Sequence, residues 1–156
     1  MFKKPNLDFI SYIKLKYINL KKRIKTNEGF SARPYKDQLG YYTIGYGHLI
    51  KKNESTYLKK NFTKKHFEHL FEKDFCLAVN FYKKFFCSNS FKKNERELLI
   101  EMIFQIGGPG VLKFKKMINN IKNNKKYMAA LEMKKSIWYK QTPARVENLI
   151  KYFLYS

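Results

Sequence analysis

Acidic residues are scarce in this chain of 156 residues: 12 Asp and Glu stand against 33 Lys and Arg, which leaves a net charge of +21. Such an excess predicts attraction to a polyanion, whether nucleic acid, an anionic membrane surface or an acidic cell-wall polymer. Arginine is scarce as well, with only four residues among the basic ones. Specific readout of bases and phosphates favours the planar arginine side chain, so the lysine excess argues against a dedicated nucleic-acid module.

Cysteine is nearly absent, with only Cys76 and Cys87. The two lie eleven residues apart in what reads as one helix, which would separate them by roughly 16 Å. That distance excludes a disulfide between them. We therefore expect two buried, reduced thiols, which is typical of a protein made in a reducing compartment.

Long apolar runs are also missing. The first apolar stretch, LDFISYIKLKYINLKK, is interrupted by Lys14 and Lys16 and lacks a small-residue cleavage site, which argues against a signal peptide and against a membrane span. Internal repeats and low-complexity linkers are not evident either. With 44% hydrophobic residues, we expect one domain over residues 1–156 with a substantial core.

Apolar residues near the amino terminus recur at helical spacing: Phe9, Ile13, Tyr17, Leu20 and Ile24. They predict a basic amphipathic helix from about Asn6 to Asn27, which makes 1–26 a helical segment, with Lys14, Lys22 and Lys25 on the opposite face. Gly29 is placed to end it. Packing on the core is the commoner fate of such a helix, although its basic face could also lie on a membrane.

Glycines and β-forming residues in YYTIGYGH predict a small antiparallel hairpin or sheet between Tyr35 and His48, within a small lobe at 27–62. Thr63 offers a cap for a long helix at 63–86 that could join two lobes. The chain from 87 to 156 reads as all helix. We therefore expect an α+β fold, predominantly helical, with a small sheet-bearing N-terminal lobe joined by the long helix to an all-helical C-terminal lobe.

Four further signals place helices in the C-terminal lobe. Asn94 with Glu97 predicts a capped helix that ends at the breaker GGPG. The stretches VLKFKKMINNI and KKYMAALEMKKSI each predict one helix. A last helix should begin at Thr142 and Pro143, where a capping residue precedes proline at the first helical position.

Glu28 and Asp37 are the only acids between Asp8 and Glu54. At the carboxy end of the first helix, the partial negative charge of the free carbonyls should raise the pKa of Glu28, which suits a general acid. If Gln38, Leu39 and Gly40 form a hairpin loop, Asp37 pairs across from Tyr41, and Thr43 becomes its diagonal neighbour.

An ionised aspartate beside a hydroxyl can hold and deprotonate a water molecule, and Gly45 and Gly47 would continue that face without side chains, open to a bulky substrate. A proton-holding acid that faces a water-holding base is the arrangement for glycoside hydrolysis with inversion, with carboxyls roughly 6.5 to 9.5 Å apart. The alternative is that Glu28 and Asp37 are solvated turn residues.

The segment EGFSARPYKDQLGYYTIGYGHLI resembles the active-site segment of the phage-type lysozymes, glycoside hydrolase family 24, best known from the T-even phages. TKKHFEHLFEKD, FQIGGPGVLKF and YMAALEMKKSIWYKQTPARV resemble further segments of that family in the same order. The resemblance runs from about Tyr17 to Phe153. It implies a muramidase that cleaves the β-1,4 bond between N-acetylmuramic acid and N-acetylglucosamine in peptidoglycan, by inversion, without a cofactor or metal.

By this resemblance Glu28 is the catalytic acid, Asp37 directs the water, and Thr43 assists beneath the scissile sugar. Leu49 and Phe104 match positions that line the sugar cleft. The resemblance further implies supporting roles for Arg145, as the partner of the glutamate, and for Gln105 and Trp138, as a buried pair near the hinge. Pairing with Arg145 would lower the pKa of Glu28, against the effect of the helix end.

The remaining histidines and the departures from the family refine this picture. His48 is expected to anchor the small lobe through a hydrogen bond or ion pair. His66 and His69 have a spacing that could hold a metal, but no third ligand is evident. Met117 and Glu132 stand where the family commonly offers serine and asparagine to the glycan. The stretch between His48 and Thr63 is shorter than the family's, which would leave the small lobe more open.

The expected partners are peptidoglycan and the anionic cell-wall surface, with no specific nucleic acid, and the expected state is a monomer. We expect an endolysin that stays in the host cytoplasm until its release to the wall, with a tail-associated lysozyme as the alternative location. A second hypothesis is a non-enzymatic cationic protein that disrupts walls or membranes with its first helix.

Overall fold

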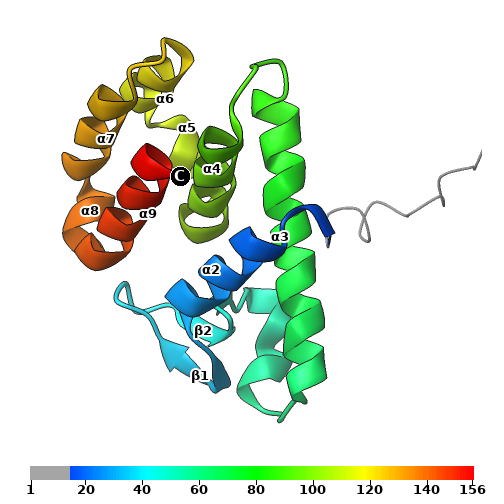
Figure 1. Ribbon diagram of the computed structural model, residues 1–156. Helices are drawn as coiled ribbons and strands as arrows, with labels where there is room; N and C mark the ends of the chain where they lie inside the picture. The colour runs from blue at the N-terminus through cyan, green and yellow to red at the C-terminus, as the bar shows by residue number, and fades with distance from the viewer. Residues whose placement is uncertain (1–14) are drawn as a thin grey trace, which may run out of the picture. The chain divides into compact units, whose positions relative to one another are not determined.

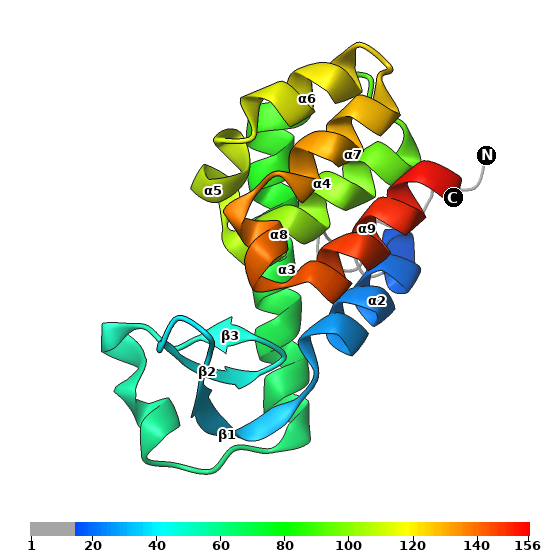
Figure 2. The same ribbon diagram turned by 90° about the vertical axis from the view of Figure 1, so that its left-hand side faces the viewer.

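The computed structural model describes residues 15–156, and the chain divides into two compact units between Leu77 and Ala78. The first unit carries a small sheet, the second is helical throughout, and helix α3 (Lys64–Phe86) runs from the first into the second. Figures 1 and 2 show these elements from two directions. The predicted fold class, α+β and predominantly helical, is confirmed.

Helix α2 (Ile18–Glu28) opens the described part of the first unit. Its buried apolar face contains Leu20 and Ile24, as the helical spacing predicted. The predicted members Phe9 and Ile13 lie outside the described residues. Gly29 ends the helix with φ +69°, and its N–H donates to the Lys25 carbonyl, because glycine tolerates the left-handed conformation that a helix end requires.

The sheet of the first unit has three antiparallel strands in the order β1 (Ser31–Lys36), β2 (Tyr42–Gly45) and β3 (His48–Leu49). The sheet begins at Ser31, earlier than the predicted Tyr35, because β1 includes Pro34. As an edge strand with an irregular register between Ser31 and Tyr35, β1 can hold a residue that has no N–H to donate. The 3₁₀ helix η1 (Lys52–Leu58) follows the sheet.

Helix α3 matches its predicted range, and the Thr63 hydroxyl caps it by accepting the His66 N–H at 3.2 Å. Its apolar face is the centre of the core of the first unit, where Phe67 and Leu70 pack with Ile44 of β2. Phe71 and Phe75 continue this face and are also buried. Phe67, Phe71 and Phe75 of one helix thus contribute three large buried rings to the core of the first unit.

The second unit continues from α3 through six further helices: α4 (Lys93–Ile106), α5 (Gly108–Leu112), α6 (Lys115–Lys122), α7 (Lys126–Lys134), α8 (Ile137–Gln141) and α9 (Pro143–Tyr155). Helix α4 packs against α5 and α9, and α7 packs against α6, α8 and α9. Leu98, Leu99 and Met102 of α4 are fully buried in this core. Helix α9 begins at Pro143, as predicted.

Two predictions for the second unit are wrong. The glutamate that caps the start of α4 is Glu95, not the predicted Glu97. The Glu95 carboxylate accepts a hydrogen bond from the Lys92 N–H at 2.8 Å. Glu97 is instead buried and accepts a hydrogen bond from the Tyr152 hydroxyl at 2.5 Å. The stretch VLKFKKMINNI is not one helix, because α5 ends at Leu112 and α6 begins at Lys115. The prediction of one helix over KKYMAALEMKKSI is confirmed by α7, because only the last residue of the stretch, Ile137, belongs to α8.

The two cysteines are free thiols, but they are not both buried as predicted. Cys76 is half-buried on α3, whereas Cys87 is exposed because α3 ends at Phe86 and Cys87 falls beyond its buried face. Within residues 15–156, no helix combines the length and the apolar character that a membrane crossing requires.

Candidate active site

Glu28 is the last residue of α2, and its half-buried side chain packs against the backbone of Gly47 in the turn between β2 and β3. A Cβ atom built on Gly47 would lie 2.6 Å from Glu28 Oε2 and 3.0 Å from its Cδ. The missing side chain of Gly47 is therefore the space that the Glu28 carboxylate occupies. The turn locates the acid by direct contact.

Gly45, the other glycine of the pair predicted to face the substrate, has a different role from the predicted one. A Cβ atom on Gly45 would lie 2.9 Å from the ring of Phe67, so this glycine lets β2 approach the core on α3. From the sequence we expected Gly45 and Gly47 to leave an open surface for substrate. That expectation is wrong for both, because a core ring fills one space and the carboxylate of Glu28 fills the other.

Asp37 is held by the loop that follows β1. Its Oδ1 accepts two backbone hydrogen bonds, from the N–H groups of Leu39 and Tyr41, each at 2.9 Å. The Asp37 N–H donates to the Tyr41 carbonyl, and Gly40 closes the loop with φ +84°. The predicted pairing of Asp37 with Tyr41 is confirmed. Two amides fix one carboxylate oxygen, which leaves Oδ2 without a protein donor among the described residues.

Thr43 lies in the middle of a row of residues that crosses the sheet. Its partner on β1 is Tyr35 and its partner on β3 is Leu49, and directly opposite residues share one face. Asp37 is two residues beyond Tyr35, so Thr43 is its diagonal neighbour on that face. Thr43 is 6% exposed, and its hydroxyl donates to the Tyr41 carbonyl over a long 3.4 Å. Leu49 is exposed.

His48 is buried beside the row and bonds two carboxylates. Its Nδ1 lies 2.7 Å from Asp74 Oδ2, and its Nε2 lies 3.1 Å from Glu54 Oε2. Burial alone would lower the pKa of His48, but the hydrogen bonds and negative charges of Asp74 and Glu54 outweigh it and raise that pKa above 6.5. The imidazole thus ties β3 to both α3 and η1.

Four of the predicted site residues lie in the second unit. With the amide oxygen of Gln105 turned toward its donors, it accepts from Trp138 Nε1 at 2.9 Å and from Arg145 Nη1 at 3.0 Å. Trp138 is buried and Gln105 half-buried. This is the hydrogen bond that a buried indole needs. Phe104 is half-buried on α4, one residue before Gln105.

The two positions that depart from the family pattern also lie in the second unit. Met117 on α6 is fully buried, so its side chain belongs to the core. Glu132 on α7 accepts a hydrogen bond from Lys135 at 3.0 Å. His66, a candidate metal ligand, is hydrogen-bonded with the Tyr57 hydroxyl at 2.9 Å. Across residues 15–156 there is no cluster of three metal-ligating side chains.

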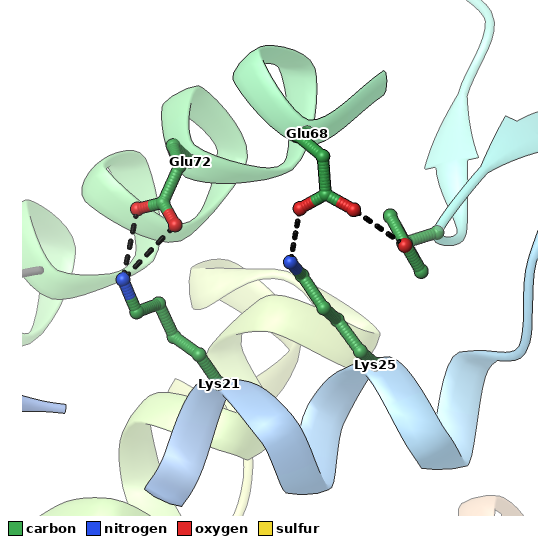
Figure 3. Close-up of polar contacts among 5 residues, drawn as sticks. Lys21, Lys25, Glu68 and Glu72 are labelled. Atoms are coloured by element: carbon green, nitrogen blue, oxygen red, sulfur yellow. Dashed lines mark hydrogen bonds and ion pairs between the residues drawn. The ribbon is translucent and has the colours of Figure 1, made fainter. Parts of the chain in front are cut away.

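Two ion pairs between α2 and α3 could not be predicted from the sequence. Lys21 donates to both oxygens of Glu72, at 2.9 and 3.0 Å, and Lys25 pairs with Glu68. Figure 3 shows the two lysines reaching from α2 to the two glutamates on α3. Lys25 was predicted to lie on the face opposite the apolar one, but it is half-buried against α3. A lysine within a basic helix carries no sequence signal of a distant partner.

Glycoside hydrolases use a pair of carboxyl groups, and the small sheet of this α+β fold carries two acids. Comparison with known proteins agrees: the family model described as phage lysozyme matches residues 25–151. The chain therefore belongs to the phage lysozyme family. "Probable T4-type lysozyme 2" of Dictyostelium discoideum is 35% identical over an alignment of 158 residues that covers 86% of this chain and 93% of that protein.

A second relative gives the same result. "Probable T4-type lysozyme 1" of Dictyostelium discoideum is 35% identical over 155 residues, with 85% of this chain and 91% of that protein covered. Family membership indicates that the protein is a lysozyme, a glycosidase that acts on peptidoglycan. The matched residues include Glu28, Asp37 and Thr43.

Proposed function

We propose that this protein is a muramidase that hydrolyses the β-1,4 bond between N-acetylmuramic acid and N-acetylglucosamine with inversion, as a member of glycoside hydrolase family 24. One observation carries the proposal: both acids are built against the same small sheet. Asp37 lies in the loop after β1, on the same face of the sheet as Thr43. Glu28 packs on Gly47 in the turn between β2 and β3. Inverting hydrolysis of a glycosidic bond requires two separate carboxyl groups, one to protonate the leaving group and one to activate water on the opposite face of the sugar.

Glu28 serves as the general acid. It is the last residue of α2, at the carboxy end of the helix. Its contact with Gly47 keeps the carboxyl in one place. Glu28 protonates the glycosidic oxygen, and the bond to the departing sugar breaks. Arg145 is proposed to stabilise the carboxylate that this transfer leaves behind.

Asp37 serves as the general base, with Thr43 beside it. The amides of Leu39 and Tyr41 orient its carboxylate through Oδ1, and Oδ2 is available to accept a proton from water. Among the described residues, the Thr43 hydroxyl makes one hydrogen bond, a long one of 3.4 Å to the Tyr41 carbonyl, so it can help to orient that water. The water then attacks the sugar from the face opposite the leaving group. Leu49 and Phe104 are proposed to line the saccharide site.

The net charge of +21 supports an encounter with the anionic cell-wall surface, which salt should weaken because charges are screened over about 8 Å at physiological ionic strength. The non-enzymatic alternative needs α2 as a free cationic helix. Lys21 and Lys25 are instead paired with Glu72 and Glu68 of α3, which favours the enzyme. Storage in a host cytoplasm before release stays a prediction, as does the monomeric state.

The substitution Glu28→Gln tests the proposal. It should abolish the release of reducing ends from purified peptidoglycan sacculi, because an amide cannot donate the catalytic proton. Glu147→Gln is the matched control, since Glu147 is a half-buried acid of the second unit bonded to Lys134 and Tyr139, and it should retain activity. Release of reducing ends by Glu28→Gln at the wild-type rate would refute the assignment.

A further inference from the structure

The turn that contacts Glu28 is itself held in place by Tyr46, the residue between its two glycines. The Tyr46 hydroxyl donates to Glu68 Oε1 on α3 at 2.6 Å. The ring packs against Phe30 and Phe71, with centroid separations of 5.0 and 5.6 Å. Packing therefore places the ring, and Glu68 fixes its hydroxyl. Any movement of Tyr46 would be transmitted to Gly47, its covalent neighbour.

Glu68 also holds the helix that carries Glu28. Its other oxygen, Oε2, pairs with the Lys25 ammonium, and Lys25 lies on α2 three residues before Glu28. The Lys25 Nζ is 4.7 Å from the ring centroid of Phe71 and 5.0 Å from that of Tyr46. One carboxylate on α3 thus bonds both elements that locate Glu28: the end of α2 and the turn at 45–47.

Glu68 is suited to this double role because it stays charged. Partial burial would raise its pKa, but the hydrogen bonds from Lys25 and Tyr46 and the nearby positive charges lower that pKa below its ordinary value of 4.5. Hydrogen bonds to a charged acceptor are shorter and stronger than neutral ones. The contact between Tyr46 and Glu68 is therefore a strong directional restraint on the turn.

A second ion pair between the same two helices provides a contrast. Lys21 and Glu72 lie one turn away from Lys25 and Glu68, and their side chains are more buried, at 8% and 20% exposed against 26% and 37%. Within the described residues, the hydrogen bonds of Glu72 come from Lys21 and do not reach the turn. If the ion pairs only joined helices, the Lys21 pair would be at least as important as the Lys25 pair.

We propose that Tyr46, Lys25 and Glu68 are positioning residues for the reaction, which hold the Glu28 carboxyl through Gly47 and the end of α2. This inference rests on the proposed role of Glu28 as the acid. Removing the Tyr46 hydroxyl leaves the ring contacts in place but frees the turn. Because a displacement of about 1 Å can cost on the order of 100-fold in rate, a partial release should lower kcat by about tenfold.

The test compares variants of the full chain on soluble peptidoglycan fragments, with kcat, apparent KM and Tm measured for each. Tyr46→Phe and Lys25→Met should lower kcat by about tenfold with KM within about twofold of wild type, because the acid is displaced while saccharide contacts remain. Lys25→Arg should restore most of the activity, since arginine can still pair with Glu68.

Two matched controls remove the same chemical groups elsewhere. Tyr139→Phe deletes a hydroxyl that donates to Glu147 at 2.7 Å, and Lys21→Met breaks the more buried ion pair. Lys21→Met should lower Tm at least as much as Lys25→Met, yet both controls should keep kcat within about twofold of wild type. Equal kcat losses in Lys21→Met and Lys25→Met would overturn the inference, because they would show a general effect of helix docking.

The outcome for Glu28→Gln separates this inference from the proposed function. If Glu28→Gln is inactive and Tyr46→Phe turns over like Tyr139→Phe, the positioning role is refuted and the acid stands. If Glu28→Gln keeps its activity, the proposed function itself fails. Should Lys25→Met not fold, Tyr46→Phe still decides, because it retains every ring contact of the wild-type residue.

Discussion

Replacing Gly47 with alanine should displace the Glu28 carboxyl while the protein still folds. The new Cβ would lie 2.6 Å from Glu28 Oε2, whereas ordinary contact begins at 3.4 Å. The oxygen must therefore retreat by about 0.8 Å. Because the obstructing atom is the far end of a flexible side chain, the acid moves and the core does not.

Two effects of the Gly47→Ala change can be given magnitudes. The backbone at Gly47 has φ +78°, and a side chain in such a conformation costs about 1–3 kcal/mol. For a chain of this length, 1 kcal/mol corresponds to roughly 2–4 °C in Tm. A displacement approaching 1 Å at a reacting group can reduce the rate by on the order of 100-fold. Activity should therefore fall much more than stability.

Gly107→Ala is the matched control for backbone strain. Gly107 lies at the end of α4 in the second unit with φ +76°, and a Cβ there would meet nothing closer than 4.0 Å. Both variants should lose comparable Tm, but only Gly47→Ala should lose kcat on soluble peptidoglycan fragments, measured well below the Tm of each. If Gly47→Ala retains wild-type kcat, or Gly107→Ala loses as much, then contact with Gly47 does not place the acid.

Two further predictions concern stability. Because the pKa of His48 is raised above 6.5 by Asp74 and Glu54, its charged form stabilises the fold below about pH 6.5, and this contribution is lost as pH rises through the folded-state pKa. His48→Gln should remove that decline from urea midpoints measured across this range, and parallel pH profiles would contradict it. In Gly108→Ala, the new Cβ would lie 2.2 Å from the Phe81 ring, so thermal unfolding should show a loss of about 1–3 kcal/mol with kcat unchanged. An unaltered Tm would refute the close approach.

Local sequence signals predicted much of the fold and part of the site. Helical spacing placed the buried face of α2, Thr63 marked the start of α3, and Gly29 marked the end of α2. The loop from Asp37 to Tyr41 was also predictable, because loop length and Gly40 determine its pairing. Each of these features depends on neighbours within a few positions along the chain.

Features that depend on distant contacts were missed or misassigned. Tyr46 and Glu68 are 22 residues apart, and no local pattern connects them. Gly47 was interpreted as open surface because the sequence does not reveal that Glu28 fills its space. The cap of α4 was misplaced by two residues because two polar residue pairs share the same spacing of three, and only packing shows that Glu97 is buried.

The anomeric configuration of the first product tests the central claim most directly. The claim is that Glu28 protonates the leaving sugar while Asp37 delivers water from the opposite face. Proton NMR of peptidoglycan fragments during the first turnovers should show the new reducing end as the α anomer, because one inverting displacement acts on a β bond. Initial release of the β anomer would contradict the account, because retention requires a second displacement through a covalent intermediate.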